Sequence, residues 1–308
     1  MTDLGVEGVE QTETTRKKPG ARGLGQKSIA LIRAMVEIVE AAQPITGRGV
    51  GYKLFVKKLI PSMKTGDMQR VYRLLKEARE RGMIPWHWIV DESRQLEKTA
   101  SWDNPDEFAR NMINSYRREY WNQQPVRVEV CSEKGTVRGV LRPVLDEFGI
   151  GFRVVHGFAS ATIVHHVAED DDGRELIVLY VGDWDPSGLC MSEHDLPDRL
   201  KRYDVAHVVL KRIALTRDQL AGLPSFPASD KTKDTRYSWF TCNYGHECWE
   251  LDALDPNLLR DCVRKQIEDY IEPVAWERCK VTERAEQESL RGIRRSWNRG
   301  RPQGWGLL

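Results

Sequence analysis

The chain has 308 residues, enough for two domains with a sizeable core, and 47 basic against 46 acidic side chains leave a formal net charge of +1. No apolar run approaches the ~20 residues of a membrane span, and the polar start is unlike a secretory signal. Six cysteines without a Cys-x-x-Cys pair are typical of a reducing compartment. These features argue against membrane-spanning and disulfide-rich classes and predict a cytoplasmic protein.

Both ends of the chain are basic and poor in apolar residues. We expect residues 1–25 to be a disordered basic tail and residues 298–308 to be a flexible one. Residues 16–27 and the segment from Arg291 onward each contain several lysines or arginines and no acidic residue. Such segments often contact nucleic acid, although solvated tails have the same composition.

Helical apolar periodicity predicts three helices, at residues 26–43, 46–61 and 67–81, followed by a strand at residues 83–90. Thr46 is a candidate N-cap for the second helix. Three short helices followed by a strand predict a winged-helix domain at residues 26–95.

The third helix is basic on the face opposite its apolar side. In a winged helix this element enters the DNA groove, so we expect it to bind double-stranded DNA. The residues expected to contact DNA are Arg70, Arg73, Lys76 and Arg79. Because Glu77 and Glu80 interleave with them, a salt-bridged surface helix is the alternative.

Residues 96–125 are polar and aromatic, with helical spacing from about Pro105 onward. We expect a connecting helix that packs the two domains together rather than a surface on which bases stack.

Residues 126–255 alternate strands and helices, which predicts an α/β domain with a mostly parallel sheet, and residues 256–297 predict terminal helices. Glu133 follows one expected strand, and Asp183 and Asp185 follow another. Because ligands gather outside the carboxyl ends of parallel strands, we expect these carboxylates to converge. Hard oxygen ligands suit Mg²⁺, so one or two magnesium ions are predicted there.

These residues carry a resemblance to a known family. A strand-end Glu133, with Gly-Asp-x-Asp-Pro-x-Gly at residues 182–188, resembles the Toprim domain of topoisomerases, primases and related nucleases. A winged helix before a Toprim domain resembles the DNA topoisomerase VI A subunit and its relative, the meiotic double-strand-break transesterase. Residues 78–86 and 91–94 look like those of short bacterial or mobile-element relatives of that subunit.

In that family an Arg-x-x-(Tyr/Phe)-Tyr pattern on the second helix ends in the tyrosine that attacks a DNA phosphate. Residues 48–52 read Arg-Gly-Val-Gly-Tyr, so the resemblance makes Tyr52 the nucleophile. Arg48, one helical turn earlier, is expected to steady the phosphate or phenolate. Gly49 and Gly51 depart from the family pattern. From its spacing alone, Tyr52 also fits a core aromatic.

The resemblance implies magnesium-dependent DNA strand cleavage through a phosphotyrosyl intermediate, in which Glu133 holds metal or moves a proton. It also implies a homodimer, in which the tyrosine of one protomer meets the metal of the other, and a nucleoid-associated location. Strand passage would require a separate ATPase partner. The alternatives are a Toprim nuclease that uses metal-activated water and a non-catalytic DNA-binding accessory protein.

Further candidates lie in the second half of the chain. A loop at residues 223–236 is expected to contact DNA phosphates through Lys231, Lys233 and Arg236. Glu250 and Asp252, in a stretch that resembles a Glu-x-Asp-Ala-Leu signature of the family, either orient the metal ligands from behind or cap and pack a helix.

Two further clusters are expected to have no metal role. The acidic run at residues 170–172 is expected to be a solvated turn. The cluster of Cys242, His246 and Cys248 is expected to be scattered side chains rather than a zinc site, because its spacing matches no common zinc motif.

Overall fold

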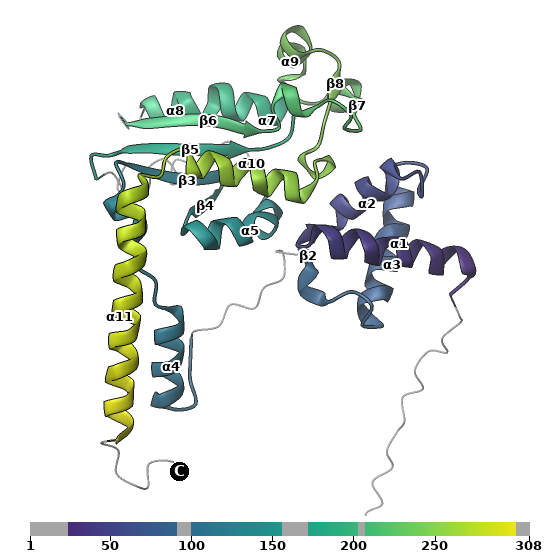
Figure 1. Cartoon of the computed structure of the whole chain (residues 1–308). Helices are drawn as coiled ribbons and strands as arrows, with labels where there is room; N and C mark the ends of the chain where they lie inside the picture. The colour runs from purple at the N-terminus through teal and green to yellow at the C-terminus, as the bar shows by residue number, and fades with distance from the viewer. Residues whose placement is uncertain (1–23, 91–99, 156–171, 203–206, 300–308) are drawn as a thin grey trace, which may run out of the picture.

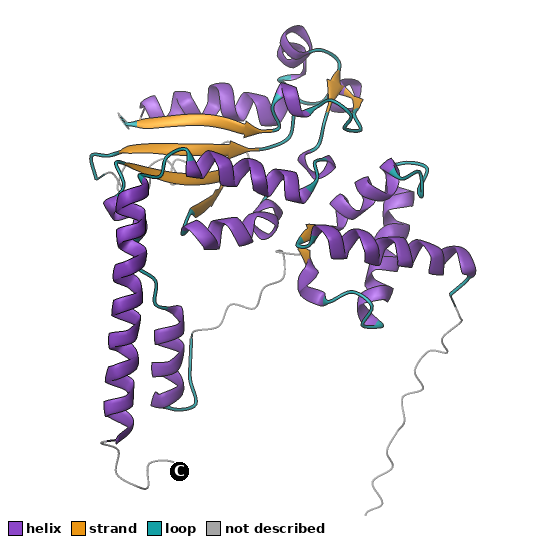
Figure 2. Cartoon of the chain, viewed as in Figure 1, coloured by secondary structure: helices purple, strands orange, loops and turns teal. Residues whose placement is uncertain are grey.

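A sheet of four parallel strands forms the centre of the chain in this computed structural model, which describes residues 24–90, 100–155, 172–202 and 207–299. The strand order is β4 (Gly151–Val154), β3 (Val126–Ser132), β5 (Glu175–Val181) and β6 (Val208–Ala214), and Figure 2 shows the strands side by side. The predicted α/β class with a parallel sheet is therefore confirmed.

The central strand β5 is buried on both faces, as its unbroken apolar sequence predicts. Ile177, Leu179 and Val181 pack into one core cluster, and Leu176, Val178 and Tyr180 pack into another. This alternation follows the two-residue period of a strand. Helices cover both faces (Figure 1): α5 (Thr136–Phe148) and α10 (Pro256–Glu268) on one, and α7 (Pro186–Cys190) and α8 (Leu196–Arg202) on the other.

The N-terminal unit has a hydrophobic core of its own. It contains α1 (Gln26–Ala42), α2 (Gly47–Val56) and α3 (Thr65–Glu80), and a two-residue parallel pairing of β1 (Ile45–Thr46) with β2 (Ile89–Val90). Thr46 is the N-cap of α2, because its hydroxyl accepts from the amide of Gly49 at 2.9 Å.

Three element boundaries differ from the sequence predictions. Helix α2 ends at Val56 rather than near Pro61, because the chain leaves the helix at Lys58, which has φ +58°. The strand expected at residues 83–90 is limited to Ile89–Val90, because Trp86–Trp88 forms the 3₁₀ helix η1. The single connecting helix is shorter than expected: α4 (Pro105–Ser115) ends before the 3₁₀ helix η3 (Tyr120–Gln123).

The connecting segment was expected to pack the two domains together, but α4 packs elsewhere. This helix lies along α11 (Pro273–Arg299), and the pair projects from the sheet (Figure 1). Tyr116 donates to Glu286 at 2.7 Å and Arg294 lies 3.2 Å from Asp106, which ties the two helices together.

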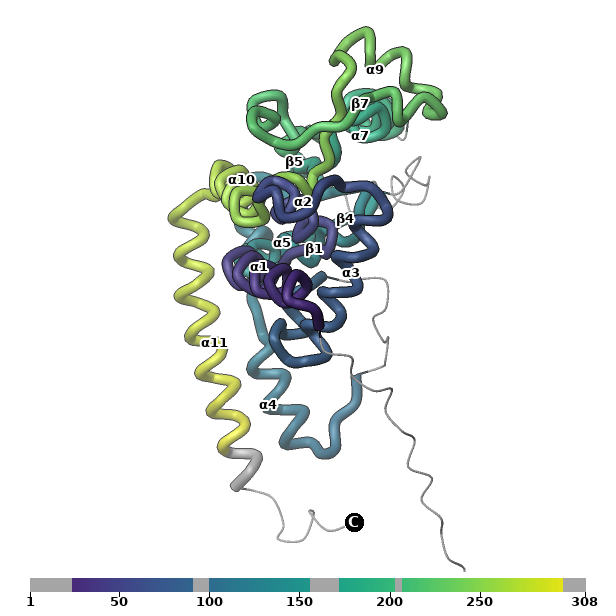
Figure 3. Tube along the Cα trace, turned by 90° about the vertical axis from the view of Figure 1, so that its right-hand side faces the viewer, coloured from purple at the N-terminus to yellow at the C-terminus, as the bar shows by residue number. Residues whose placement is uncertain are grey.

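The N-terminal unit is instead joined to the sheet domain through α10. The buried guanidinium of Arg260 donates to the carbonyl oxygens of Ala42, Gln43 and Pro44 at the end of α1, and to that of Val140 in α5. Arginine thus satisfies carbonyl groups that a helix C-terminus leaves without partners. The N-terminal unit lies beside the ends of α5 and α10 in Figure 1, and it comes to the front in a view turned by 90° (Figure 3).

The segment expected to be one loop at residues 223–236 contains regular structure. It includes β7 (Phe226–Pro227) and the 3₁₀ helix η6 (Ala228–Lys231). Helix α9 (Tyr237–Tyr244) follows, and β8 (Glu247–Cys248) returns to pair antiparallel with β7. The 3₁₀ helix η7 (Leu251–Ala253) then leads into α10.

Several predictions fall outside the described residues. They concern most of the N-terminal tail, residues 91–95 of the first predicted domain, Asp170 and Asp171, and the tail from residue 300. Within the described ranges, no helix has the length and apolar character needed to cross a membrane.

Candidate functional site

Glu133, Asp183 and Asp185, here called the acidic rim, lie at the carboxyl ends of two adjacent strands. Strands β3 and β5 pair in parallel as far as Cys131 and Tyr180, so Glu133 and the Asp-x-Asp turn leave the sheet at the same edge. Asp185 is 4% exposed, and the other two are partly buried. The sequence prediction that both motifs meet at one edge of a parallel sheet therefore agrees with the structure.

One oxygen of each aspartate is fixed by a backbone amide. Oδ1 of Asp185 accepts from the amide of Gly188 at 2.8 Å, which makes Asp185 the N-cap of α7. Oδ1 of Asp183 accepts from the amide of Leu251 at 2.8 Å. A backbone hydrogen bond thus fixes the orientation of each carboxylate.

The other oxygen of each aspartate faces a lysine. Nζ of Lys134 lies 2.9 Å from Oδ2 of Asp183, and Nζ of Lys231 lies 3.1 Å from Oδ2 of Asp185. Burial lowers the pKa of both lysines, but the neighbouring aspartates outweigh it and raise the pKa of each. Both ammonium groups therefore stay protonated at neutral pH.

Glu133 is held by hydroxyl groups instead of an ammonium group in the part of the chain that the structure describes. Tyr180 donates to its Oε1 at 2.9 Å, and Ser187 donates to its Oε2 at 3.3 Å. Burial raises the pKa of Glu133, and the negative charges of Asp185 and Asp183 raise it further. A carboxyl group with a raised pKa at this position is suited to exchange protons.

Arg212 of β6 supports the turn that carries both aspartates. Its guanidinium donates to carbonyl oxygens of Leu215 at 2.8 Å and Gly188 at 3.1 Å, and to those of Gly182 and Asp183. It also donates to the hydroxyl of Ser192 at 3.0 Å. The sequence analysis missed Arg212, because nothing in the pattern of β6 distinguishes it from an ordinary strand residue.

The donor set fits a hard divalent cation, although the side chains are not placed for one. As they stand, the described residues include no group of three or more histidine, cysteine or acidic side chains positioned to hold a metal ion. Each aspartate holds an ammonium group instead. Three carboxylates at one rim are the ligand type that Mg²⁺ takes, provided that the two lysines move.

Tyr52 lies on α2 and is 4% exposed. Arg48, one turn earlier, places its guanidinium 5.8 Å from the centre of the Tyr52 ring and donates to both carboxylate oxygens of Glu250. Burial raises the pKa of Tyr52, and the nearby charge of Glu250 raises it further. The predicted pair of Tyr52 and Arg48 is therefore assembled on one helix, next to Glu250 of the same chain.

A series of contacts connects α2 to the acidic rim. Thr46 donates to Oδ1 of Asp252 at 2.6 Å, and Oδ2 of Asp252 lies 3.4 Å from Nζ of Lys134. Lys134 in turn contacts Asp183. Asp252 thus lies between the N-cap of α2 and Lys134 of the rim, whereas Glu250 contacts α2 through Arg48.

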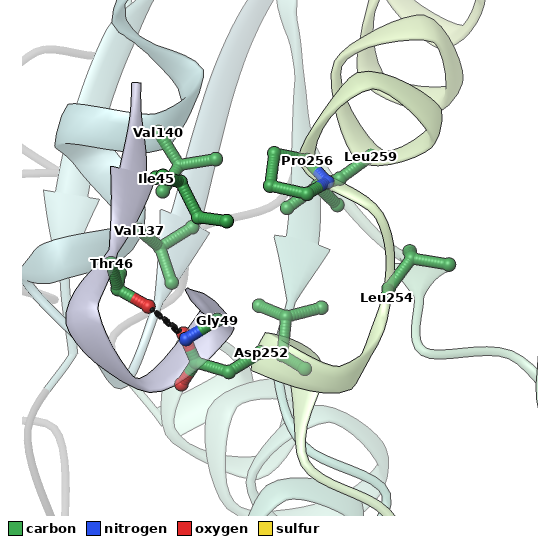
Figure 4. A pocket seen from close by; sticks show the side chains of 10 residues that line it. Ile45, Thr46, Gly49, Val137, Val140, Asp252, Leu254, Pro256 and Leu259 are labelled. Atoms are coloured by element: carbon green, nitrogen blue, oxygen red, sulfur yellow. Dashed lines mark hydrogen bonds between the residues drawn. The ribbon is translucent and has the colours of Figure 1, made fainter. Parts of the chain in front are cut away.

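A small cavity lies at the same junction (Figure 4). Its volume is about 20 Å³, and Thr46, Val137, Asp252 and Leu259 are among its lining residues. This volume has room for about one water molecule. The cavity is therefore too small for an organic cofactor or substrate.

Gly49 and Gly51, which depart from the family pattern, face close neighbours. A Cβ atom on Gly51 would lie 2.5 Å from the end of the Met68 side chain, and one on Gly49 would lie 3.0 Å from Ile45. An aromatic side chain at position 51 would require the Met68 side chain of α3 to move. Glycine at these positions allows α2 to approach its neighbours closely.

The basic residues expected on DNA have different surroundings. Arg70 and Arg73 are exposed and form no ion pair among the described residues, whereas Lys76 lies 3.5 Å from Glu80. Arg79 stacks on the exposed ring of Trp86 at 4.2 Å. Lys233 is exposed, Lys231 holds Asp185, and Arg236 pairs with Asp234 at 2.7 Å. The salt-bridged alternative for α3 is therefore seen at Lys76, and DNA contact by Arg70 and Arg73 stays a prediction.

The described residues of the two clusters expected to have no metal role have the following surroundings. Asp172 pairs with Arg174 and lies 3.4 Å from Arg127; the hydrogen bond from Arg174 lowers the pKa of Asp172 to about 2. Cys248 is buried in the core, whereas Cys242 and His246 are exposed.

Comparisons of the chain with protein-family models, with curated proteins and with solved structures find no match.

Proposed function

We propose that this chain is a winged-helix and Toprim-like protein that cleaves DNA with a divalent cation at the acidic rim, using Tyr52 as the nucleophile. The observation that carries the proposal is the position of Glu133, Asp183 and Asp185 at the carboxyl ends of adjacent parallel strands. Such an edge is where α/β sheets bind their ligands.

The contacts of α2 support the assignment of Tyr52. Its helix is connected to the rim through Arg48 with Glu250 and through Thr46 with Asp252. In the proposed reaction the Tyr52 hydroxyl oxygen bonds to phosphorus while the bond from phosphorus to the 3′ oxygen breaks, which leaves a phosphotyrosyl link. Glu250 is placed to accept the phenolic proton, and Glu133 to donate one to the leaving oxygen.

The remaining groups position the phosphate. Arg48 lies over the Tyr52 ring and is placed to stabilise negative charge as the phenolate forms. Asp183 and Asp185 would hold Mg²⁺, which stabilises negative charge on phosphoryl oxygens when bound, and Glu133 would join them as a ligand only if it is not the proton donor. Arg70 and Arg73 of α3 would bind the backbone of double-stranded DNA. We further propose a homodimer, with a separate ATPase partner for strand passage.

One observation favours a second candidate, hydrolysis by water. Tyr52 is almost fully buried and its pKa is raised, which opposes formation of the phenolate. A nuclease that uses metal-activated water at the same rim would need Tyr52 only for packing.

The decisive experiment is the trapping of covalent protein–DNA adducts on supercoiled plasmid in Mg²⁺ or Mn²⁺. The wild-type chain should form an adduct that Tyr52→Phe and the double variant Asp183→Asn/Asp185→Asn both lose. Tyr72→Phe, at an exposed tyrosine of α3, is the matched control and should keep it. Cleavage that survives Tyr52→Phe but not the aspartate variant would select hydrolysis. DNA binding without cleavage in either metal would select the non-catalytic accessory protein.

A further inference from the structure

We propose that Lys134 and Lys231 are resident cations of the acidic rim, and that a divalent cation displaces Lys231 so that its ammonium group becomes available to a DNA phosphate. The proposal rests on the metal site of the proposed function. It gives Lys134 a role that no motif assigns, makes the expected contact of Lys231 with DNA phosphate depend on metal, and predicts that metal binding and DNA binding depend on each other.

The two aspartates repeat one arrangement. In each, Oδ1 accepts from a backbone amide at 2.8 Å, from Leu251 for Asp183 and from Gly188 for Asp185. In each, Oδ2 faces an ammonium group, at 2.9 Å from Lys134 and at 3.1 Å from Lys231. Oδ2 of Asp185 and both oxygens of Asp183 therefore face positive charge, and the ammonium groups occupy the side of the carboxylates that a metal would approach.

The two lysines differ in how firmly they are held. Lys134 is close to both oxygens of Asp183 and lies 3.4 Å from Asp252, and its side chain is 33% exposed. Lys231 contacts one oxygen of Asp185 and is 41% exposed. A partly exposed ion pair contributes little stability, because water replaces the contact easily. Lys231 is therefore the one that a divalent cation displaces.

Displacement of Lys231 links two binding events. While it contacts Asp185, its charge is neutralised and is poorly available to phosphate. Once a cation takes Oδ2 of Asp185, the ammonium group lies beside the rim with its charge uncompensated, and a phosphate oxygen is the fitting partner. Because binding free energies are reciprocal, the factor by which the metal increases the affinity for DNA must equal the factor by which DNA increases the affinity for the metal.

The first test measures Mn²⁺ affinity from the electron paramagnetic resonance signal of the unbound ion. Lys231→Met should bind Mn²⁺ more tightly than the wild-type chain, by up to about fivefold, because a competing cation is gone. Lys233→Met is the matched control, since Lys233 is exposed and two residues away, and it should leave the affinity unchanged. Asp183→Asn/Asp185→Asn should abolish binding at the rim.

The second test measures affinity for a short DNA duplex by fluorescence anisotropy, in Ca²⁺ and in EDTA. In Ca²⁺, Lys231→Met should weaken DNA binding more than Lys233→Met does. In EDTA, the two variants should weaken DNA binding equally, because Lys231 is then held by Asp185. Thermal unfolding of each variant shows whether the fold is kept.

The outcomes separate this inference from the proposed function. If the wild-type chain binds Mn²⁺ no better than the double aspartate variant, the metal site fails and both proposals fall. If the aspartates are required but Lys231→Met binds Mn²⁺ equally or more weakly, only the role of Lys231 is overturned. An equal effect of Lys231→Met on DNA binding in Ca²⁺ and in EDTA overturns it as well.

Discussion

A backbone contact at Gly188 fixes the shape of the turn that carries both aspartates. A Cβ atom at this position would lie 2.3 Å from the carbonyl oxygen of Asp183. That oxygen accepts from Arg212, which also binds the carbonyl group of Gly188 itself. Neither segment can move away without breaking these hydrogen bonds, so the close approach of two backbone segments requires glycine here.

Substitution of Gly188 by alanine should therefore destabilise the chain by about 1–3 kcal/mol, as overpacking does in a tight site. The free energy of unfolding in urea measures this. Gly66→Ala is the matched control: Gly66 also lies in a helix, and a Cβ atom there meets nothing within 4 Å. Alanine at Gly66 should stabilise by about 0.5–1 kcal/mol. Equal losses at both positions would show that Gly188 has no special contact.

At the scale of elements, α2 is attached to the sheet domain by two cations. Arg48 binds Glu250, and Lys53 binds Asp255, the N-cap of α10. Burial raises the pKa of Asp255, but the hydrogen bond from Lys53 outweighs it, so the pKa lies below its ordinary value of 3.8. A carboxyl group whose pKa is lowered by folding stabilises the folded state at any pH above its ordinary pKa. This stabilisation is lost as the pH falls through the lowered pKa.

Lys53→Met should thus destabilise the chain at pH 7 by up to about 1 kcal/mol, and the difference from the wild-type chain should shrink as the pH falls below 4. Unfolding free energies measured at a series of pH values give this difference. Lys57→Met, at an exposed lysine just beyond the end of α2, should show neither effect. A loss that stays constant down to pH 2.5 would mean that Lys53 acts through packing.

The elements also show how far sequence patterns reach. The apolar run of β5, the cap at Thr46 and the edge position of Asp183 follow from local sequence, and the structure agrees with each. The contacts of Lys134 and Lys231 with the aspartates could not be predicted from the sequence, because no local pattern indicates that Lys231 lies next to Asp185 in the fold. The end of α2 was also missed, since it depends on the conformation of Lys58.

At the scale of the whole molecule, the N-terminal unit and the sheet domain meet at η7 and α10, next to the acidic rim. Arg260 holds the end of α1, while η7 contacts α2 on one side and Asp183 on the other. This arrangement buries Tyr52 against Glu250 of its own chain. Attack by Tyr52 on DNA at a metal held by a partner protomer would therefore require the contact between Arg48 and Glu250 to open.

The metal site itself is tested most directly by an anomalous difference map from crystals soaked in Mn²⁺. We predict a peak within coordination distance of Oδ2 of Asp183 and Oδ2 of Asp185, with Nζ of Lys231 moved away from Asp185. A map without a peak at this rim, with both lysines still on their aspartates, would contradict the metal site and the cleavage chemistry that depends on it.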